Sequence, residues 1–197
     1  MLAVLFCPPC TLMVQGLFLT PSAEAVWFNL NPQQISEALE YGKAGRDTKM
    51  ADFSREWTVS LGDKIGWATL YSPFNNLTYK ARKAAVERRE LTEEEVKKAL
   101  ETADTLSFSV TVFSDSLYYT YQRLSYIKQG EKTVRPSYEF LPDICENSDF
   151  FPESPAFVAA CVYKFPVKDL DPSTQITLVV IKPTGDELPF PFDLSKM

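Results

Sequence analysis

The stretch Thr105-Leu-Ser-Phe-Ser-Val-Thr-Val-Phe-Ser114 decides the fold class, because apolar and hydroxyl residues alternate along it almost without a break. Successive side chains of a β-strand point to opposite faces, so a period of two predicts a strand with one buried and one wet face. The predicted core face carries Leu106, Phe108, Val110 and Val112. Such a strand needs partners that cover its apolar face, and the flanking sequence supplies them.

The rest of the chain contains further segments with the composition of strands, separated by turn residues. The turns Gly62-Asp63-Lys64, Gln129-Gly130-Glu131 and Pro183-Thr184-Gly185 each join two of these segments into a predicted hairpin. Besides 105–114, the predicted strands are residues 57–61, 65–71, 118–128, 133–140, 157–165, 176–181 and 188–194.

The last of these strands contains Pro189 and Pro191, which have no N–H to donate to a sheet. We therefore expect it at a sheet edge. Its alternate residues, which we expect to pack inward, are Leu188, Phe190, Phe192 and Leu194.

Helical signals precede the strand at 105–114. Asn31 can cap a helix that begins at Pro32. Residues 75–103 change to a helical period and predict two helices that meet near Leu91, the second of which begins with a capping box of Thr92 and Glu95.

About eight strands with helices inserted early predict an α+β fold, mainly an antiparallel β-sandwich with an N-terminal helix and a two-helix insertion. A partly open β-barrel is the alternative. No repeat or linker divides the chain, so we expect residues 26–197 to form one β-rich globular domain with its helical insertion at 75–103.

Residues 1–25 have the pattern of a cleaved signal peptide, an apolar run that ends in Ala23-Glu24-Ala25. Cleavage there makes Val26 the first mature residue. The pattern lacks a basic n-region, since no Lys or Arg precedes Lys43. A retained membrane anchor is the alternative, which the prolines and polar residues of the segment disfavour. We expect an exported protein, periplasmic or extracellular, without a transmembrane segment after cleavage.

Cysteine usage follows from this compartment. Of four cysteines, Cys7 and Cys10 leave with the signal, whereas Cys145 and Cys161 stay in the mature chain. A single pair in an oxidising compartment predicts one disulfide, and two buried free thiols are the alternative.

Composition excludes several function classes. The chain has no histidine, which removes Ser-His-Asp and Cys-His catalysis and His-ligated metal centres. It has no glycine-rich phosphate loop, and we expect no cofactor. The mature chain keeps 25 of 26 acidic residues and all 20 basic ones, a net charge of −5, so nucleic acid is not an expected partner.

Three groups of residues are candidates for a site. The first is an acidic loop whose carboxylates would suit Ca²⁺, although it lacks the spacing of a calcium loop and a solvated loop is the alternative. It comprises Asp143, Glu146, Asp149 and Glu153.

The second candidate is a tyrosine-rich stretch in which Tyr119, Tyr121 and Arg123 share a strand face, a possible stacking surface for a sugar or peptide. The alternative is that these tyrosines belong to the core. The third candidate is a basic cluster that could dock an acidic partner or simply be solvated. It contains Lys80, Arg82, Lys83, Arg88 and Arg89.

Two function classes remain. We favour an exported non-enzymatic module that binds an envelope protein or a glycan through a sheet face or the last edge strand. The alternative is a carboxylate-dependent hydrolase, for example of glycosides, which needs two facing carboxyls with one pKa raised. Its acid and base would come from Asp115, Asp143, Glu146 and Asp149; we nominate no catalytic residue.

Overall fold

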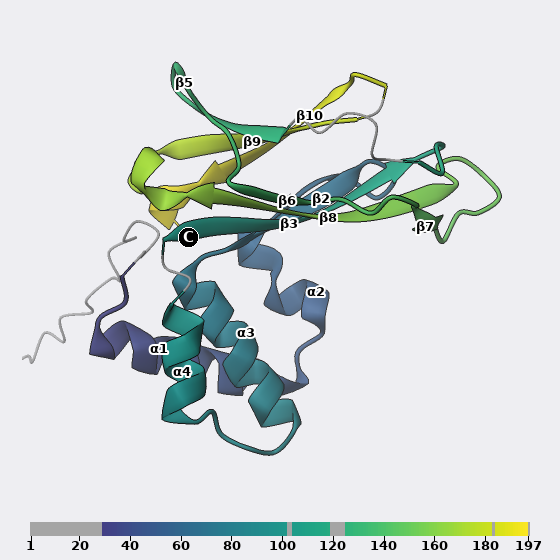
Figure 1. Cartoon of the computed structure of the whole chain (residues 1–197). Helices are drawn as coiled ribbons and strands as arrows, with labels where there is room; N and C mark the ends of the chain where they lie inside the picture. The colour runs from purple at the N-terminus through teal and green to yellow at the C-terminus, as the bar shows by residue number, and fades with distance from the viewer. Residues whose placement is uncertain (1–28, 102–103, 119–124, 183, 197) are drawn as a thin grey trace, which may run out of the picture.

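A computed structural model describes residues 29–101, 104–118, 125–182 and 184–196. Figure 1 shows three layers, in which a six-stranded sheet lies between a four-stranded sheet and a group of helices. The helices are α1 (Pro32–Ala44), α2 (Met50–Phe53), α3 (Pro73–Val86) and α4 (Glu93–Leu100). The strands are β1 (Thr58–Gly62), β2 (Gly66–Tyr71), β3 (Thr105–Ser114), β4 (Ser125–Gln129), β5 (Lys132–Val134), β6 (Tyr138–Phe140), β7 (Glu146–Asn147), β8 (Phe157–Pro166), β9 (Gln175–Ile181) and β10 (Glu187–Asp193).

Both sheets are antiparallel. The larger has the order β1-β2-β3-β8-β6, with β7 also paired to β8, and the smaller has the order β10-β9-β4-β5. The predicted α+β fold with an antiparallel sandwich is confirmed; the two sheets face each other without closing into a barrel.

The predicted central strand is β3, which pairs with β8 from Thr105↔Pro166 to Ser114↔Phe157 and with β2 on its other side. Its apolar face is fully buried between the two sheets. The ring of Phe108 lies 5.8 Å from that of Phe165 and 5.1 Å from that of Phe192 on the opposite sheet, so the alternation builds the core.

The strand with two prolines, β10, is an edge of the smaller sheet, as predicted. Pro189 and Pro191 are exposed, whereas Phe190 between them faces the core. Leu188, Phe190, Phe192 and Leu194 are all buried.

The helix caps are those that the sequence predicts. The Asn31 side chain accepts a hydrogen bond from the Gln34 N–H at 3.0 Å, and α4 begins with the Thr92–Glu95 capping box. The helix α3 begins at Pro73, slightly earlier than predicted, because Ser72 caps it directly after β2.

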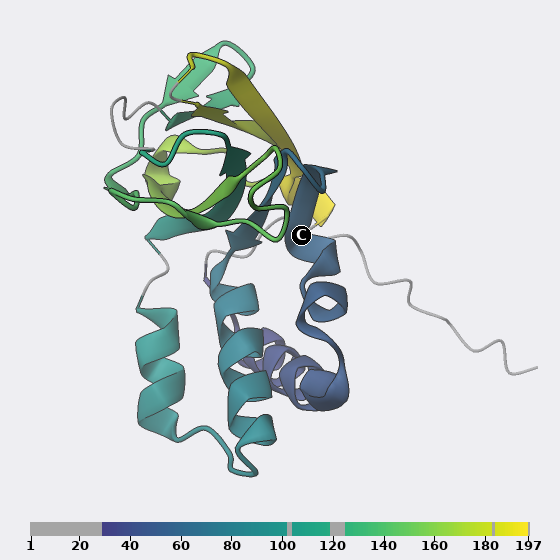
Figure 2. The same ribbon diagram turned by 90° about the vertical axis from the view of Figure 1, so that its right-hand side faces the viewer.

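The helices form a layer with a small core of its own. Ala38, Leu77 and Ala99 are buried together, and Gly42 of α1 lies against Thr78 and Ala81 of α3. Figures 1 and 2 show this layer on the outer face of the six-stranded sheet, the face turned away from the smaller sheet; the β7 end extends past the helices.

Two local predictions are wrong. The expected arm 133–140 is split: β5 pairs with β4, but β6 crosses to β8 in the other sheet, because Pro136 between them cannot continue a ladder. Trp57 lies in a 3-10 turn before β1 rather than in a strand, where it packs against Tyr41 and Phe53 of the helical layer.

In this structure Cys145 and Cys161 are free thiols, and both are buried in the sandwich core. The disulfide between them stays a prediction for an oxidising compartment. Among the described residues, no helix has the length and apolarity that crossing a membrane requires. The predicted signal peptide, residues 1–25, lies outside the described residues.

Candidate functional site

A cavity of about 690 Å³ lies between the helical layer and the outer face of the six-stranded sheet. We call it the neutral groove. Its floor is made by three neighbouring strands and contains Thr58, Ser60, Trp67, Thr69, Tyr71 and Ser109. The opposite wall contains Met50 and Ala51 of α2, Ser54, which directly follows α2, and Tyr79 of α3.

The floor follows from strand alternation. In β2, Ala68 and Leu70 face the sandwich core, so Trp67, Thr69 and Tyr71 face outward. The strand register then places hydroxyls side by side, Thr58 opposite Thr69 and Thr69 opposite Ser109. The hydroxyls of Thr58 and Thr69 share a hydrogen bond of 2.8 Å.

Aromatic rings form the apolar part of the neutral groove. Trp67 is 37% exposed, and the rings of Tyr71 and Tyr79 lie 5.2 Å apart at an angle of 34°. Burial is the main reason that the pKa of Tyr71 rises to about 12. The neighbouring Tyr79 adds to the rise, through its negative charge when it is ionised and through a hydrogen bond with Tyr71. Tyr71 therefore stays a neutral phenol at physiological pH.

The segment that leads into α2 is held by Arg82 of α3. Its Nε donates to the Gly45 carbonyl oxygen at 3.0 Å and its Nη2 to that of Thr48 at 2.6 Å. The guanidinium also lies 5.2 Å from the Phe53 ring centre. These contacts position Met50 and Ala51 above the strands.

The predicted tyrosine surface, Tyr119, Tyr121 and Arg123, lies outside the described residues. In the predicted basic cluster, Arg82 holds the segment before α2, Lys83 lies near Glu87, and Arg89 pairs with Glu87 and Glu95. These three bases already have partners within the chain, which weakens the case for an acidic partner.

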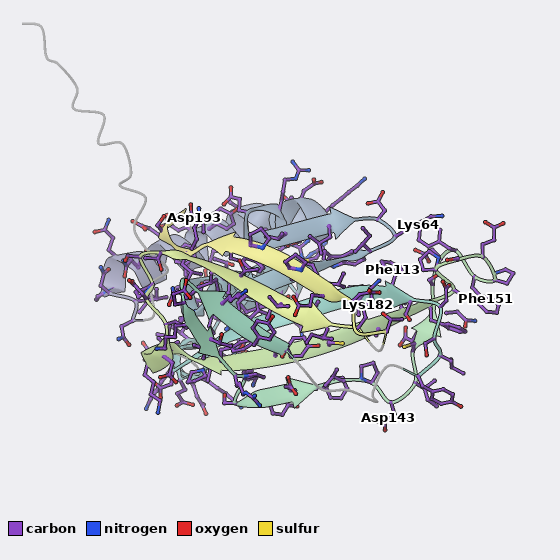
Figure 3. The ribbon with its side chains drawn as sticks, turned by 90° about the horizontal axis from the view of Figure 1, so that it is seen from above. Lys64, Phe113, Asp143, Phe151, Lys182 and Asp193 are labelled. Atoms are coloured by element: carbon purple, nitrogen blue, oxygen red, sulfur yellow. The ribbon has the colours of Figure 1, made fainter. Side chains whose placement is uncertain are left out.

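The predicted calcium ligands do not converge. Within the described ranges, no group of three or more acidic or cysteine side chains could hold a metal ion. Asp143 points outward from the loop after β6 (Figure 3), and Glu153 is exposed in the loop before β8.

Asp115, a candidate acid of the hydrolase alternative, has a structural role. It accepts hydrogen bonds from the Ser154 hydroxyl at 2.8 Å and the Ala156 N–H at 2.9 Å. The Ala156 N–H above all, and then the Ser154 hydroxyl, hold the pKa of Asp115 below its usual range. A general acid requires the opposite shift.

Comparison of the chain with protein-family models and with curated proteins found no match. A crystal structure from Burkholderia pseudomallei, described as a novel protein of unknown function, aligns over 85% of this chain and 91% of that chain. The identity is 10% and the TM-score is 0.40, so this similarity carries no argument about function.

Proposed function

We propose that this protein is an exported, non-enzymatic binding module that holds a neutral, hydroxyl-bearing unit of its ligand, such as a sugar ring, in the neutral groove. One observation carries the proposal. The lining combines three aromatic rings with five serine and threonine side chains, and it includes no carboxylate, ammonium or guanidinium group.

This lining fits the chemistry of a sugar. One face of a sugar ring carries C–H groups that pack on aromatic rings, and its edge carries hydroxyls that exchange hydrogen bonds with serine and threonine. The groove volume of about 690 Å³ falls within the usual range of small-molecule sites. A charged ligand would lose hydration there without gaining an opposite charge.

The same lining supports a binding role rather than catalysis. Glycoside hydrolysis needs two carboxyls that flank the scissile bond, and none of the residues that line the neutral groove carries a carboxyl. No observation favours the hydrolase alternative at Asp115, because its carboxylate is engaged by the loop before β8.

Replacing Trp67 by alanine tests the proposal. We expect calorimetric titration with three neutral oligosaccharides, the oligomers of N-acetylglucosamine, cellulose and maltose, to find one that binds the wild type. Its affinity should fall about tenfold in Trp67→Ala. Phe151→Ala is the matched control, because Phe151 is a 50% exposed aromatic residue that does not line the groove. Failure of all three oligomers to bind, or equal affinity in Trp67→Ala, would overturn the proposal.

A further inference from the structure

A second cavity, of about 510 Å³, adjoins the neutral groove on the outer face of the six-stranded sheet, and Trp67 lines both. We call it the acidic cleft. We propose that the ligand is an oligosaccharide whose first unit lies in the neutral groove and whose next unit carries an ammonium group into the acidic cleft. This inference rests on the proposed function and specifies its ligand.

The strand register places the two cavities next to each other along β3. Ser109 lines the neutral groove, and Thr111, the next outward residue of β3, lines the acidic cleft about 7 Å further along. Thr111 lies between Trp67 of β2 and Ala160 of β8. Because Ser109, Thr111 and Ala160 are small, we infer that a ligand can extend past Trp67 from one cavity to the other.

The acidic cleft also offers apolar surface. The Phe113 ring packs 5.8 Å from that of Trp67, and Phe140 and Ile144 line the cleft while 52% and 59% exposed. Figure 3 shows Phe113 at the same end of the molecule as Lys64 and Phe151, beyond the helical layer. Large apolar side chains that a fold leaves uncovered commonly mark a binding surface.

Charge distinguishes the acidic cleft from the neutral groove. Glu146 and Asp149 line the cleft, and neither forms an ion pair with any residue in the described part of the chain. The ammonium of Lys64, at this end, is held by the Ser154 carbonyl oxygen and lies 4.7 Å from the Phe150 ring centre. Two carboxylates at one cavity favour a cationic group on the ligand.

A glycan fits these surfaces better than a basic peptide. An extended peptide gains affinity by main-chain hydrogen bonds at a free sheet edge. On the floor of the acidic cleft, β3 is paired along both sides, to β2 and to β8. The edge strands that also line the cleft, β6 and β7, are only three and two residues long, too short to pair with an added strand. The hydroxyls of Ser109 and Thr111 instead match the hydroxyls of a sugar chain.

The test compares the N-acetylglucosamine disaccharide with the same disaccharide deacetylated at one unit only, prepared in both sequences and titrated by calorimetry. We expect the wild type to bind the sequence that places its single ammonium in the acidic cleft about fivefold more tightly than the fully acetylated disaccharide at low salt. Glu146→Gln combined with Asp149→Asn should remove this preference, so that the two disaccharides bind with about equal affinity. Asp143→Asn combined with Glu153→Gln is the control, because it removes the same charge outside the cleft.

The outcomes separate the two proposals. Equal affinity for the acetylated and the singly deacetylated disaccharides, with binding still dependent on Trp67, overturns the ammonium site and leaves the proposed function intact. Binding of neither disaccharide overturns the inference, and it overturns the proposed function as well only where the oligomers of cellulose and maltose also fail to bind. Preferential binding of a lysine-rich peptide, lost in the Glu146 and Asp149 variant, also overturns the inference and identifies a peptide as the occupant of the cleft.

Discussion

The backbone conformation of Gly66 sets the direction in which the next side chain of β2, Trp67, points into the two cavities. Its φ is +143°, which side chains with a Cβ rarely adopt, and a Cβ there would collide with the Thr111 carbonyl oxygen on β3. We expect Gly66→Ala to lower the free energy of unfolding by about 2 to 4 kcal/mol, because strain and a backbone collision add. Urea denaturation measures this loss.

Gly130 provides the control for this substitution. It also has a positive φ, +57°, but a Cβ there would have no neighbour within 4 Å. Gly130→Ala should therefore cost only about 1 kcal/mol, the strain of the left-handed backbone alone. Equal losses in the two variants would show that the contact with β3 is unimportant.

Tyr71 predicts a pH dependence of stability. The unfolded pKa is near 10.0 and the folded pKa is about 12, chiefly because of burial, so the folded state retains this proton where the unfolded state loses it. The stabilisation from Tyr71 is full below pH 10 and is lost as the pH rises to about 12. Unfolding titrations across this window should show a smaller decline in Tyr71→Phe; the same decline in both proteins would contradict the assignment.

At the scale of elements, the attachment of β7 depends on few contacts. Its two residues pair with β8 as Glu146↔Val158 and Asn147↔Phe157, and Cys145 directly precedes them. Cys145 and Cys161 belong to the same buried core, and burial above all raises the pKa of the Cys161 thiol, to which Cys145 adds. We expect an oxidising compartment to join them, which would stabilise the fold by about 3 kcal/mol in the chain-entropy model.

Intact mass after alkylation in denaturant tests this bridge. Unfolding is required because burial raises the pKa of the Cys161 thiol to about 12, so the folded thiol is unreactive. Protein from an oxidising compartment should gain two alkyl groups only after reduction, and protein made in a reducing cytoplasm should gain them without it. Alkylation of the exported protein without reduction would establish free thiols.

Local sequence signals account for most of the elements. The alternation at 105–114, the Asn31 and Thr92 caps and the prolines of β10 each act within a few residues, so they can be recognised without the tertiary structure. The crossing of β6 to the other sheet could not be predicted, because β6 pairs with residues 162–164, more than twenty positions away.

The neutral groove was missed for the same reason. Its lining joins a helix at Met50, strands at Thr58 and Trp67, and Ser109 beyond two more helices. Tyrosines that are adjacent in sequence, around Tyr119, are the more visible candidates. One usable signal was present: the wet faces of 66–71 and 105–114 carry Trp67 among serines and threonines, and a tryptophan is costly to leave on a purely solvated face.

At the scale of the whole molecule, export remains a prediction from the first residues. We expect the protein in its host's soluble extracytoplasmic fraction to begin at Val26, because the apolar run ends in a small-residue cleavage pattern. Intact mass spectrometry measures this directly. An uncleaved species in the membrane fraction would instead support a retained anchor.

Alternate residues of β2 and β3 face the core and the cavities, and this alternation has an evolutionary consequence. Ala68, Leu70, Phe108 and Val110 hold the two sheets together, while their neighbours Trp67, Thr69, Ser109 and Thr111 face the cavities. On the proposed function, we expect substitutions at the second set to change ligand recognition without removing a core side chain. New ligands would then arise at these positions while folding is conserved, and the same four outward positions are the natural choice for a randomised library that seeks altered specificity.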